Sequence, residues 1–251
     1  MQKTSSELKR LAREKLNGNW GLVISTFLVA VLIPALCMLP FTLTLPEHPS
    51  TSQQAIYNMA SFIISFIEIL FACGLVKFHL ALSRTGDQSF GDIMYAFSHK
   101  PLRFIGANIL FGLLASLPTI PGIILVLWAF GDPMPVLIFF AVIFIAAGIV
   151  LSIIISLQYS LLYCLLIDRS EEKVLDLFRE SKRLMKGNKG RAFYINLSFI
   201  GLVLLAVLSF GIGMLWVGPY MSQTQVQLYL SILEEQQPTT QTEDRFEDYV
   251  I

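Results

Sequence analysis

Five long apolar runs constrain this chain more than any other feature of its sequence. They cover residues 20–39, 59–80, 102–129, 135–166 and 192–208. A helix needs about 20 apolar residues to cross the hydrocarbon core of a bilayer, and each run approaches or exceeds that length. Charged residues make up only 14% of the 251 residues, against about 25% in soluble domains, whose surfaces must be hydrated. The sequence therefore excludes an ordinary soluble enzyme and predicts an all-α, polytopic transmembrane helix bundle.

A sixth segment, 213–233, is less apolar because it contains Gln223, Gln225 and Gln227. Its hydropathy alone favours an interfacial helix. The segment follows two glycines at 211 and 213, which predict a turn between two helices. We count it as a sixth membrane helix whose glutamines hydrogen-bond to neighbouring helices.

Basic residues are concentrated in three stretches. Residues 1–19, 77–103 and 169–191 contain 17 of the 18 lysines and arginines. Because Lys and Arg accumulate in cytoplasmic loops beside membrane helices, these stretches are predicted to be cytoplasmic. Six crossings would place the C-terminus in the cytoplasm as well.

Each basic stretch also has the apolar spacing of an amphipathic surface helix. Thr4 with Glu7, and Ser89 with Asp92, have the spacing of a capping box, and Gly18 and Gly187 predict helix ends. The predicted apolar faces consist of Leu8, Leu11, Ala12 and Leu16; of Phe90, Ile93, Met94 and Phe97; and of Val174, Leu177, Phe178, Ser181, Leu184 and Met185.

An Asn-Gly element at 17–21 recurs in similar form at 186–190, each time between a basic helix and an apolar run. The chain is thus predicted to contain three units, 4–84, 89–167 and 170–235, each a cytoplasmic surface helix followed by a transmembrane hairpin. Together they form one integral membrane domain, 1–235. The tail 236–251 is polar and acidic, which is typical of disorder.

The stretches 181–191, 197–201 and 211–220 resemble a bacterial membrane family catalogued as domain of unknown function 975. This chain is longer than the family pattern over about 124–156. The resemblance implies a multi-pass helical protein of the plasma membrane, found largely in Gram-positive bacteria, and supplies no catalytic residues. Further positions that fit the family are Gly74, Arg84, Phe90, Asp92, Phe97, Pro121, Gly122, Ile123, Tyr159, Ser160 and Asp168.

Glu68 lies in the middle of the second apolar run. An acid at the bilayer centre costs about 2.5–3.5 kcal/mol on insertion scales, so Glu68 is predicted to face the bundle interior. Its candidate partners are Asn108, Gln158 and Asn196, which also lie within apolar runs. Two interpretations stay open: a proton, cation or polar-ligand site, and a packing hydrogen bond that fixes helix register.

A second candidate site is the basic segment near the third surface helix. Each Lys or Arg close to an anionic membrane surface contributes about 1 kcal/mol of attraction, so this cluster is a candidate contact for anionic lipid headgroups. The alternative is that the charges serve membrane orientation alone. The cluster consists of Lys182, Arg183, Lys186, Lys189 and Arg191.

The sequence contains no motif for catalysis, metal binding or a cofactor. Cys37, Cys73 and Cys164 are widely spaced, and His79 and His99 have no nearby acidic, Cys or His partners in the sequence. HExxH, GxSxG and P-loop patterns are absent, and the zero net charge does not suit nucleic acid.

We therefore expect a non-enzymatic membrane protein without a cofactor. It would act as an accessory or interaction module for another membrane process, such as export or envelope stress, with a membrane-protein partner or further copies of itself. The alternative is a small transporter or channel that uses Glu68 and the intramembrane amides. The proline break at 118–122 favours that alternative, because broken helices line substrate sites in transporters.

Overall fold

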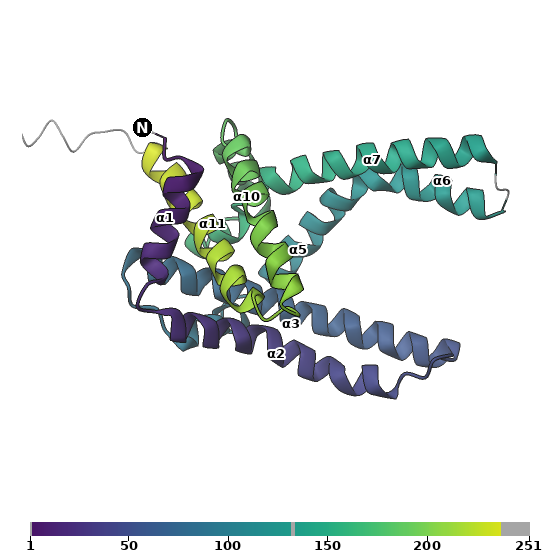
Figure 1. Ribbon diagram of the computed structural model, residues 1–251, viewed down its shortest axis with the longest axis horizontal. Helices are drawn as coiled ribbons and strands as arrows, with labels where there is room; N and C mark the ends of the chain where they lie inside the picture. The colour runs from purple at the N-terminus through teal and green to yellow at the C-terminus, as the bar shows by residue number, and fades with distance from the viewer. Residues whose placement is uncertain (1, 132–133, 237–251) are drawn as a thin grey trace, which may run out of the picture.

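The computed structural model describes residues 2–131 and 134–236, and these form helices and connecting turns without any strand (Figure 1). The predicted all-α class is confirmed. The predicted disordered tail falls outside the described residues except for Gln236, which is the last residue of a helix.

The helices follow one another with short connections. In chain order they are α1 Ser5–Leu16, α2 Trp20–Thr44, α3 Thr51–Arg84, η1 Phe90–Met94, α4 Tyr95–Ser98, α5 Pro101–Ser116, η2 Leu117–Thr119, α6 Ile120–Gly131, α7 Pro135–Gln158, α8 Leu162–Asp168, α9 Val174–Leu184, α10 Lys189–Leu208 and α11 Met214–Gln236.

Five helical segments among the described residues are long and apolar enough to cross a membrane, and they match the five predicted runs. The segment Pro101–Gly131 joins α5 to α6 through the 3-10 turn η2, where Pro118 lies in the first turn. The sixth predicted membrane helix exists as α11, which pairs with α10. It is not among the five apolar segments, so a sixth crossing stays a prediction.

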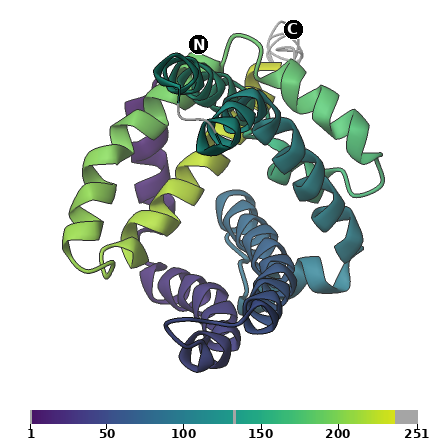
Figure 2. The same ribbon diagram turned by 90° about the vertical axis from the view of Figure 1, so that its right-hand side faces the viewer.

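Two hairpins extend from a common base in the same direction. Figure 1 shows α2–α3 as one arm and α6–α7 as the other, with α1, α10 and α11 at the base. The end-on view in Figure 2 shows the two arms apart from each other. In the apolar windows of Pro101–Gly131 and Pro135–Asp168, only 6% and 11% of the residues are buried. The arm of α6 and α7 is therefore a two-helix hairpin with little buried core, whereas 22% and 39% of the residues are buried in the apolar windows of α2 and α3.

The third hairpin has a different orientation. In Figure 1, α10 and α11 run steeply across the direction of both arms. Helix α1 packs along α11 and reaches α10, where Lys9 Nζ donates a hydrogen bond to the Ser198 carbonyl at 3.3 Å. A helix predicted to lie on the membrane surface thus contacts the middle of the fifth apolar segment. The three predicted units share a sequence pattern but not one arrangement.

Most of the tightly packed core lies in the base. The predicted faces of α1 and α9 are largely buried, with Leu8, Leu16 and Leu177 fully enclosed. Both predicted capping boxes form, at Thr4 and at Ser89, and Gly18 and Gly187 adopt positive φ after α1 and α9 as predicted.

The middle surface helix differs from its prediction. Residues 90–98 form a 3-10 turn and one short α-helix, and Phe90 and Met94 are exposed while Ile93 is buried. The reason is a close backbone contact with α3. A Cβ atom on Gly74 would lie 2.0 Å from the Ile93 carbonyl oxygen, so η1 rests directly on the α3 backbone. Only Ile93 of η1 is buried in the core, in place of a full helical face.

Candidate functional site

The predicted intramembrane site around Glu68 is not assembled. Glu68 is exposed in a groove of about 240 Å³ between α2 and α3, whose other lining residues are apolar. None of Asn108, Gln158 and Asn196 contributes to that groove. The prediction that Glu68 faces a polar partner in the bundle interior is therefore wrong for the described residues. The physical reason is that α2 and α3 pack as a separate arm, with one side of the pair uncovered.

The three amides are distributed over other helix contacts. Asn108 in α5 donates a hydrogen bond to the Tyr163 hydroxyl in α8. Gln158 Oε1 accepts from Lys189 Nζ at 3.0 Å. Asn196 is exposed and lines a groove of about 320 Å³ between α7 and α10. Asn108 and Gln158 bond to different helices, and the three amides do not form a common site.

Two members of the predicted lipid-binding cluster, Arg183 and Arg191, are ion-paired within the protein. Arg191 is mostly buried, and its Nη1 lies 3.1 Å from both carboxylate oxygens of Glu235. Arg183 donates two hydrogen bonds of 2.7 Å to Glu180. Within the described part of the chain, Lys182 and Lys186 are the exposed members without an ion pair. The five residues are therefore divided between ion-paired arginines and lysines without an acidic partner among the described residues, and lipid contact stays a prediction.

A buried polar network between α3 and α11 was not predicted as a site. His79 and Gln223 are both fully buried, and His79 Nδ1 donates to Gln223 Oε1 at 2.7 Å. Gln223 Nε2 donates to Ser83 Oγ at 2.6 Å, and Gln227 Nε2 reaches the same oxygen at 3.1 Å. The prediction that the glutamines of this segment bond to other helices is confirmed.

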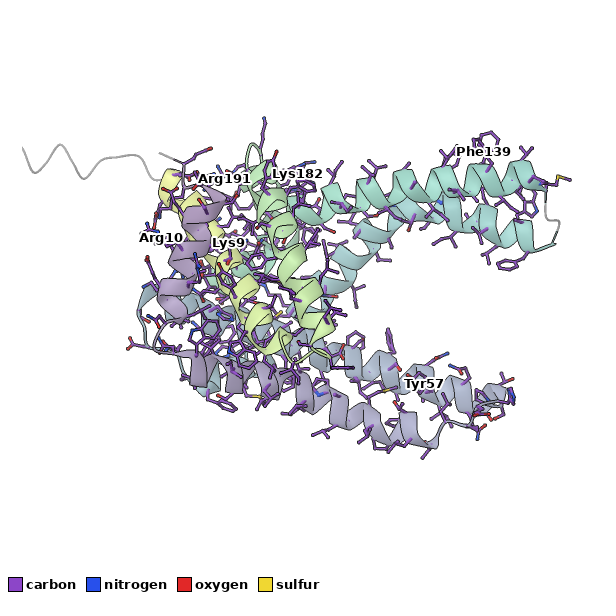
Figure 3. The ribbon with its side chains drawn as sticks, viewed as in Figure 1. Lys9, Arg10, Tyr57, Phe139, Lys182 and Arg191 are labelled. Carbon is purple, nitrogen blue, oxygen red and sulfur yellow. The ribbon has the colours of Figure 1, made fainter. Side chains whose placement is uncertain are left out.

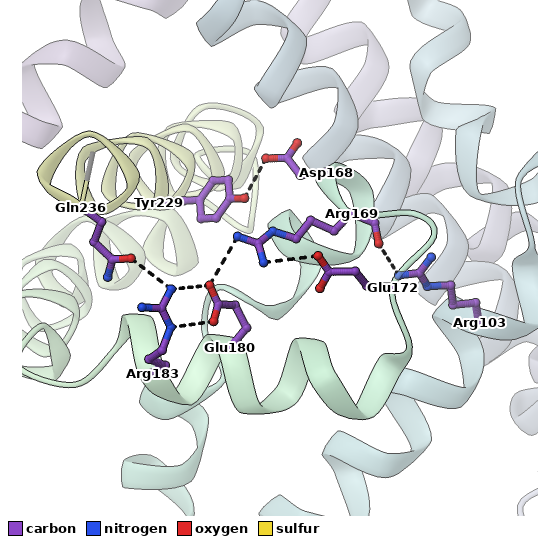
Figure 4. Close-up of polar contacts among 8 residues, drawn as sticks. All are labelled: Arg103, Asp168, Arg169, Glu172, Glu180, Arg183, Tyr229 and Gln236. Atoms are coloured by element: carbon purple, nitrogen blue, oxygen red, sulfur yellow. Dashed lines mark hydrogen bonds and ion pairs between the residues drawn. The ribbon is translucent and has the colours of Figure 1, made fainter. Parts of the chain in front are cut away.

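A separate ion pair joins α3 to α8. The two terminal nitrogens of Arg84 bind the two carboxylate oxygens of Asp168 at 2.7 and 2.6 Å, and the Tyr229 hydroxyl donates to Asp168 at 2.7 Å (Figure 4). Bidentate pairs of this kind fix both distance and orientation. The ends of α3 and α8 and the middle of α11 are thereby held together.

A second set of ionic contacts connects the loop after α8 to α9 (Figure 4). Arg169 lies between Glu172 and Glu180, at 3.4 and 3.3 Å, and Glu180 also binds Arg183. The hydrogen bond from Arg183 holds the pKa of the Glu180 carboxyl below its ordinary value of 4.5. Arg103 Nη2 donates to the Arg169 carbonyl at 2.7 Å, which joins the start of α5 to the same cluster.

The sequence contained a weak signal for the buried network. Gln223 and Gln227 are four residues apart, which places both on one helix face, and Arg84 and Asp168 are among the positions that fit the family resemblance. Spacing alone could not reveal that His79 would meet Gln223, because these two residues are 144 positions apart.

The chemistry of the network is that of a structural clamp. Its buried donors and acceptors bond to one another, which is the low-energy arrangement for polar groups away from water. Among the described residues, no three His, Cys, Asp or Glu side chains come together in a way that could hold a metal ion. The described cysteines are free, and Cys73 and Cys164 are buried in the core.

Comparison with known proteins places the chain in a family. Neither curated proteins nor solved structures give a match. The family model described as "Protein of unknown function (DUF975)" matches residues 1–236. This match spans nearly the whole chain and agrees with the resemblance carried by the stretches 181–191 and 211–220. The chain belongs to the DUF975 family of proteins of unknown function.

Proposed function

We propose that this protein is a non-enzymatic accessory protein of a bacterial plasma membrane, in which the base is a rigid platform and the two arms contact another membrane protein. The proposal includes a Gram-positive host and cytoplasmic N- and C-termini. It is supported by one structural observation above all, the exposed apolar faces of two arms that extend from a base in which most of the packed core lies.

The arms expose far more apolar surface than they share. Phe139 on α7 and Leu36 on α2 are 62% and 60% exposed. Figure 3 shows Phe139 and Tyr57 far out on the two arms, whereas Lys9, Lys182 and Arg191 lie at the base. Lipid tails or transmembrane helices of a partner must cover these apolar surfaces. Because helix association in membranes depends on close packing rather than on apolarity, uncovered helical faces are available to a partner.

The transporter alternative has less support. Transporters bind substrate near the bilayer midplane, where broken helices bring polar groups together. The helix break at η2 exists, but the described residues around it are apolar or hydroxyl-bearing, and Glu68 lies on the other arm. A polar site shared by the two arms is not present in the described part of the chain.

A photocrosslinking experiment tests the proposal. A photoreactive residue replaces Phe139 in the intact protein in its native membrane, and a matched control replaces Leu175, which is 60% exposed on α9 at the base. We expect discrete protein adducts at Phe139 that are absent at Leu175. Crosslinks to lipid alone at Phe139 would contradict an accessory role exerted through the arms.

Reconstitution tests the alternative directly. Liposomes that contain the purified protein should not dissipate a proton or cation gradient faster than empty liposomes. A flux that disappears in Glu68→Gln would overturn the proposal and establish the transporter interpretation.

A further inference from the structure

A cavity of about 250 Å³ lies at the start of α5, between α4 and the connection from α8 to α9. Its lining combines two cations, one acid, hydroxyl groups and an apolar floor. Among these residues are Lys100 and Arg103, Glu171, Ser98 and Ser170, and Phe104 and Leu166. The floor is fully buried. Since α5 begins an apolar segment long enough to cross the membrane, the cavity lies where the chain passes from a basic stretch into that segment.

Arg103, which lines this cavity, has a hydrogen-bond donor without a partner in the described part of the chain. One of its terminal nitrogens donates to the Arg169 carbonyl (Figure 4). Its Nε is buried and has no hydrogen-bond partner. A buried donor without an acceptor is destabilising, more so when it carries charge. The described part of the protein provides no acceptor for the Nε of Arg103, and the adjoining cavity has space for a ligand that carries one.

Lys100 supplies the second cation at the rim. Its backbone is left-handed, with φ 55°, and it is the N-cap of α5. Its ammonium lies 3.0 Å from Glu171, but the two side chains are 59% and 83% exposed. Exposed ion pairs contribute about 1 kcal/mol or less, so an incoming anion can replace Glu171 as the partner of Lys100.

Phosphate chemistry fits these groups. Arginine and lysine side chains together bind phosphate oxygens in many proteins, and the first turn of a 16-residue helix adds the positive end of its dipole. The apolar floor suits the glycerol and first acyl carbons of a phospholipid. We propose that this cavity binds a phosphate group, as an anionic phospholipid headgroup or as free phosphate, through Arg103 and Lys100.

This proposal is independent of the accessory role proposed above and of the predicted cluster at 182–191. Arg191 of that cluster also has a buried Nε without a described partner, but both arginines of the cluster are ion-paired with glutamates, whereas Arg103 donates to a backbone carbonyl. The cavity is therefore better suited to bind a ligand than the more strongly basic segment.

The test uses the full chain purified in a neutral detergent. Native mass spectrometry measures retention of phosphatidylglycerol against phosphatidylcholine, and a thermal-shift assay measures stabilisation by inorganic phosphate. The site variant is Lys100→Asn with Arg103→Gln, in which asparagine tolerates the positive φ of position 100. The control is Lys182→Gln with Lys186→Gln, which removes the same charge from exposed positions on or beside α9. Glu171→Gln removes the competing acid.

We expect the site variant to bind its phosphate ligand at least about tenfold more weakly, since charged hydrogen bonds contribute about 1.5–3 kcal/mol each. The control should match the wild type, and Glu171→Gln should bind up to about fivefold more tightly. Retention of phosphatidylglycerol without a response to phosphate identifies a headgroup; a response to phosphate alone identifies free phosphate.

Three results would overturn the proposal. The first is a wild type that binds neither probe. The second is an equal loss of binding in the control variant, which would indicate general attraction by surface charge. The third is unchanged binding in the site variant. If the double variant does not fold, Lys100→Asn alone and Glu171→Gln still decide the question, because the proposal requires these two to change affinity in opposite directions.

Discussion

Gln223 offers the sharpest test of the buried clamp. Replacement by leucine keeps a side chain of similar size but removes the hydrogen bonds to His79 and Ser83, at 2.7 and 2.6 Å. Ser83 retains a donor in Gln227 at 3.1 Å. His79, which is 1% exposed, loses the partner of its Nδ1 and has no access to water.

The expected loss in the free energy of unfolding follows from the lost hydrogen bonds and from the unpartnered Nδ1 of His79. Each lost hydrogen bond costs about 0.5–1.5 kcal/mol net, and an orphaned buried donor costs about 1–3 kcal/mol. Allowing for the extra apolar contact of leucine, Gln223→Leu should lower the free energy of unfolding by about 3 kcal/mol. The matched control is Gln225→Leu on the same helix. Gln225 is half-buried and makes one hydrogen bond to the Ser160 carbonyl at 3.2 Å, so about 1 kcal/mol or less is expected.

The assay is unfolding of the full chain in mild detergent by added dodecyl sulfate, followed by tryptophan fluorescence. A double-mutant cycle with His79→Leu isolates the interaction. When both partners become apolar, no orphaned group is left, so the double variant should lose about 1–2 kcal/mol less than the two single losses combined. Additive losses, or a Gln223→Leu protein as stable as the Gln225→Leu control, would refute the reasoning.

Three further predictions concern packing, pH and topology. Gly74→Ala should destabilise the protein by about 2–3 kcal/mol, because its Cβ would overlap the Ile93 carbonyl. Gly106→Ala, which has open space around the added Cβ, should be neutral or slightly stabilising in the same unfolding assay. The lowered pKa of Glu180 beside Arg183 gives a stabilising contribution that is complete above its ordinary pKa of 4.5 and declines as the pH falls through the lower folded-state value. Melting temperatures from pH 7 to pH 3 should therefore fall more in wild type than in Glu180→Gln, and equal slopes would argue against this pair. A phosphatase that works only outside the cytoplasm should be inactive when fused to the C-terminus, since the end of α11 lies beside the basic N-terminal stretch; high activity would contradict an even number of crossings.

Local properties of the sequence determined much of this fold. The five apolar runs became the five segments able to cross a membrane. The capping boxes mark the starts of α1 and η1, and the terminal glycines follow α1 and α9 as predicted. These features depend on residues within one or two helical turns of each other, so pattern and spacing are enough to predict them.

The candidate sites depended on distant contacts, and there the sequence was less informative. Glu68 was expected to need a polar partner, yet tertiary packing left α2 and α3 as a separate arm with the acid in an apolar groove. The basic segment was a candidate contact for anionic headgroups, yet α11 returns with Glu235 to pair with Arg191. His79 had no partner nearby in the sequence, yet Gln223 lies against it in the fold. Hydropathy and charge count measure the preference of each side chain for water or lipid, whereas the partner of a buried polar group is decided by which helices pack together.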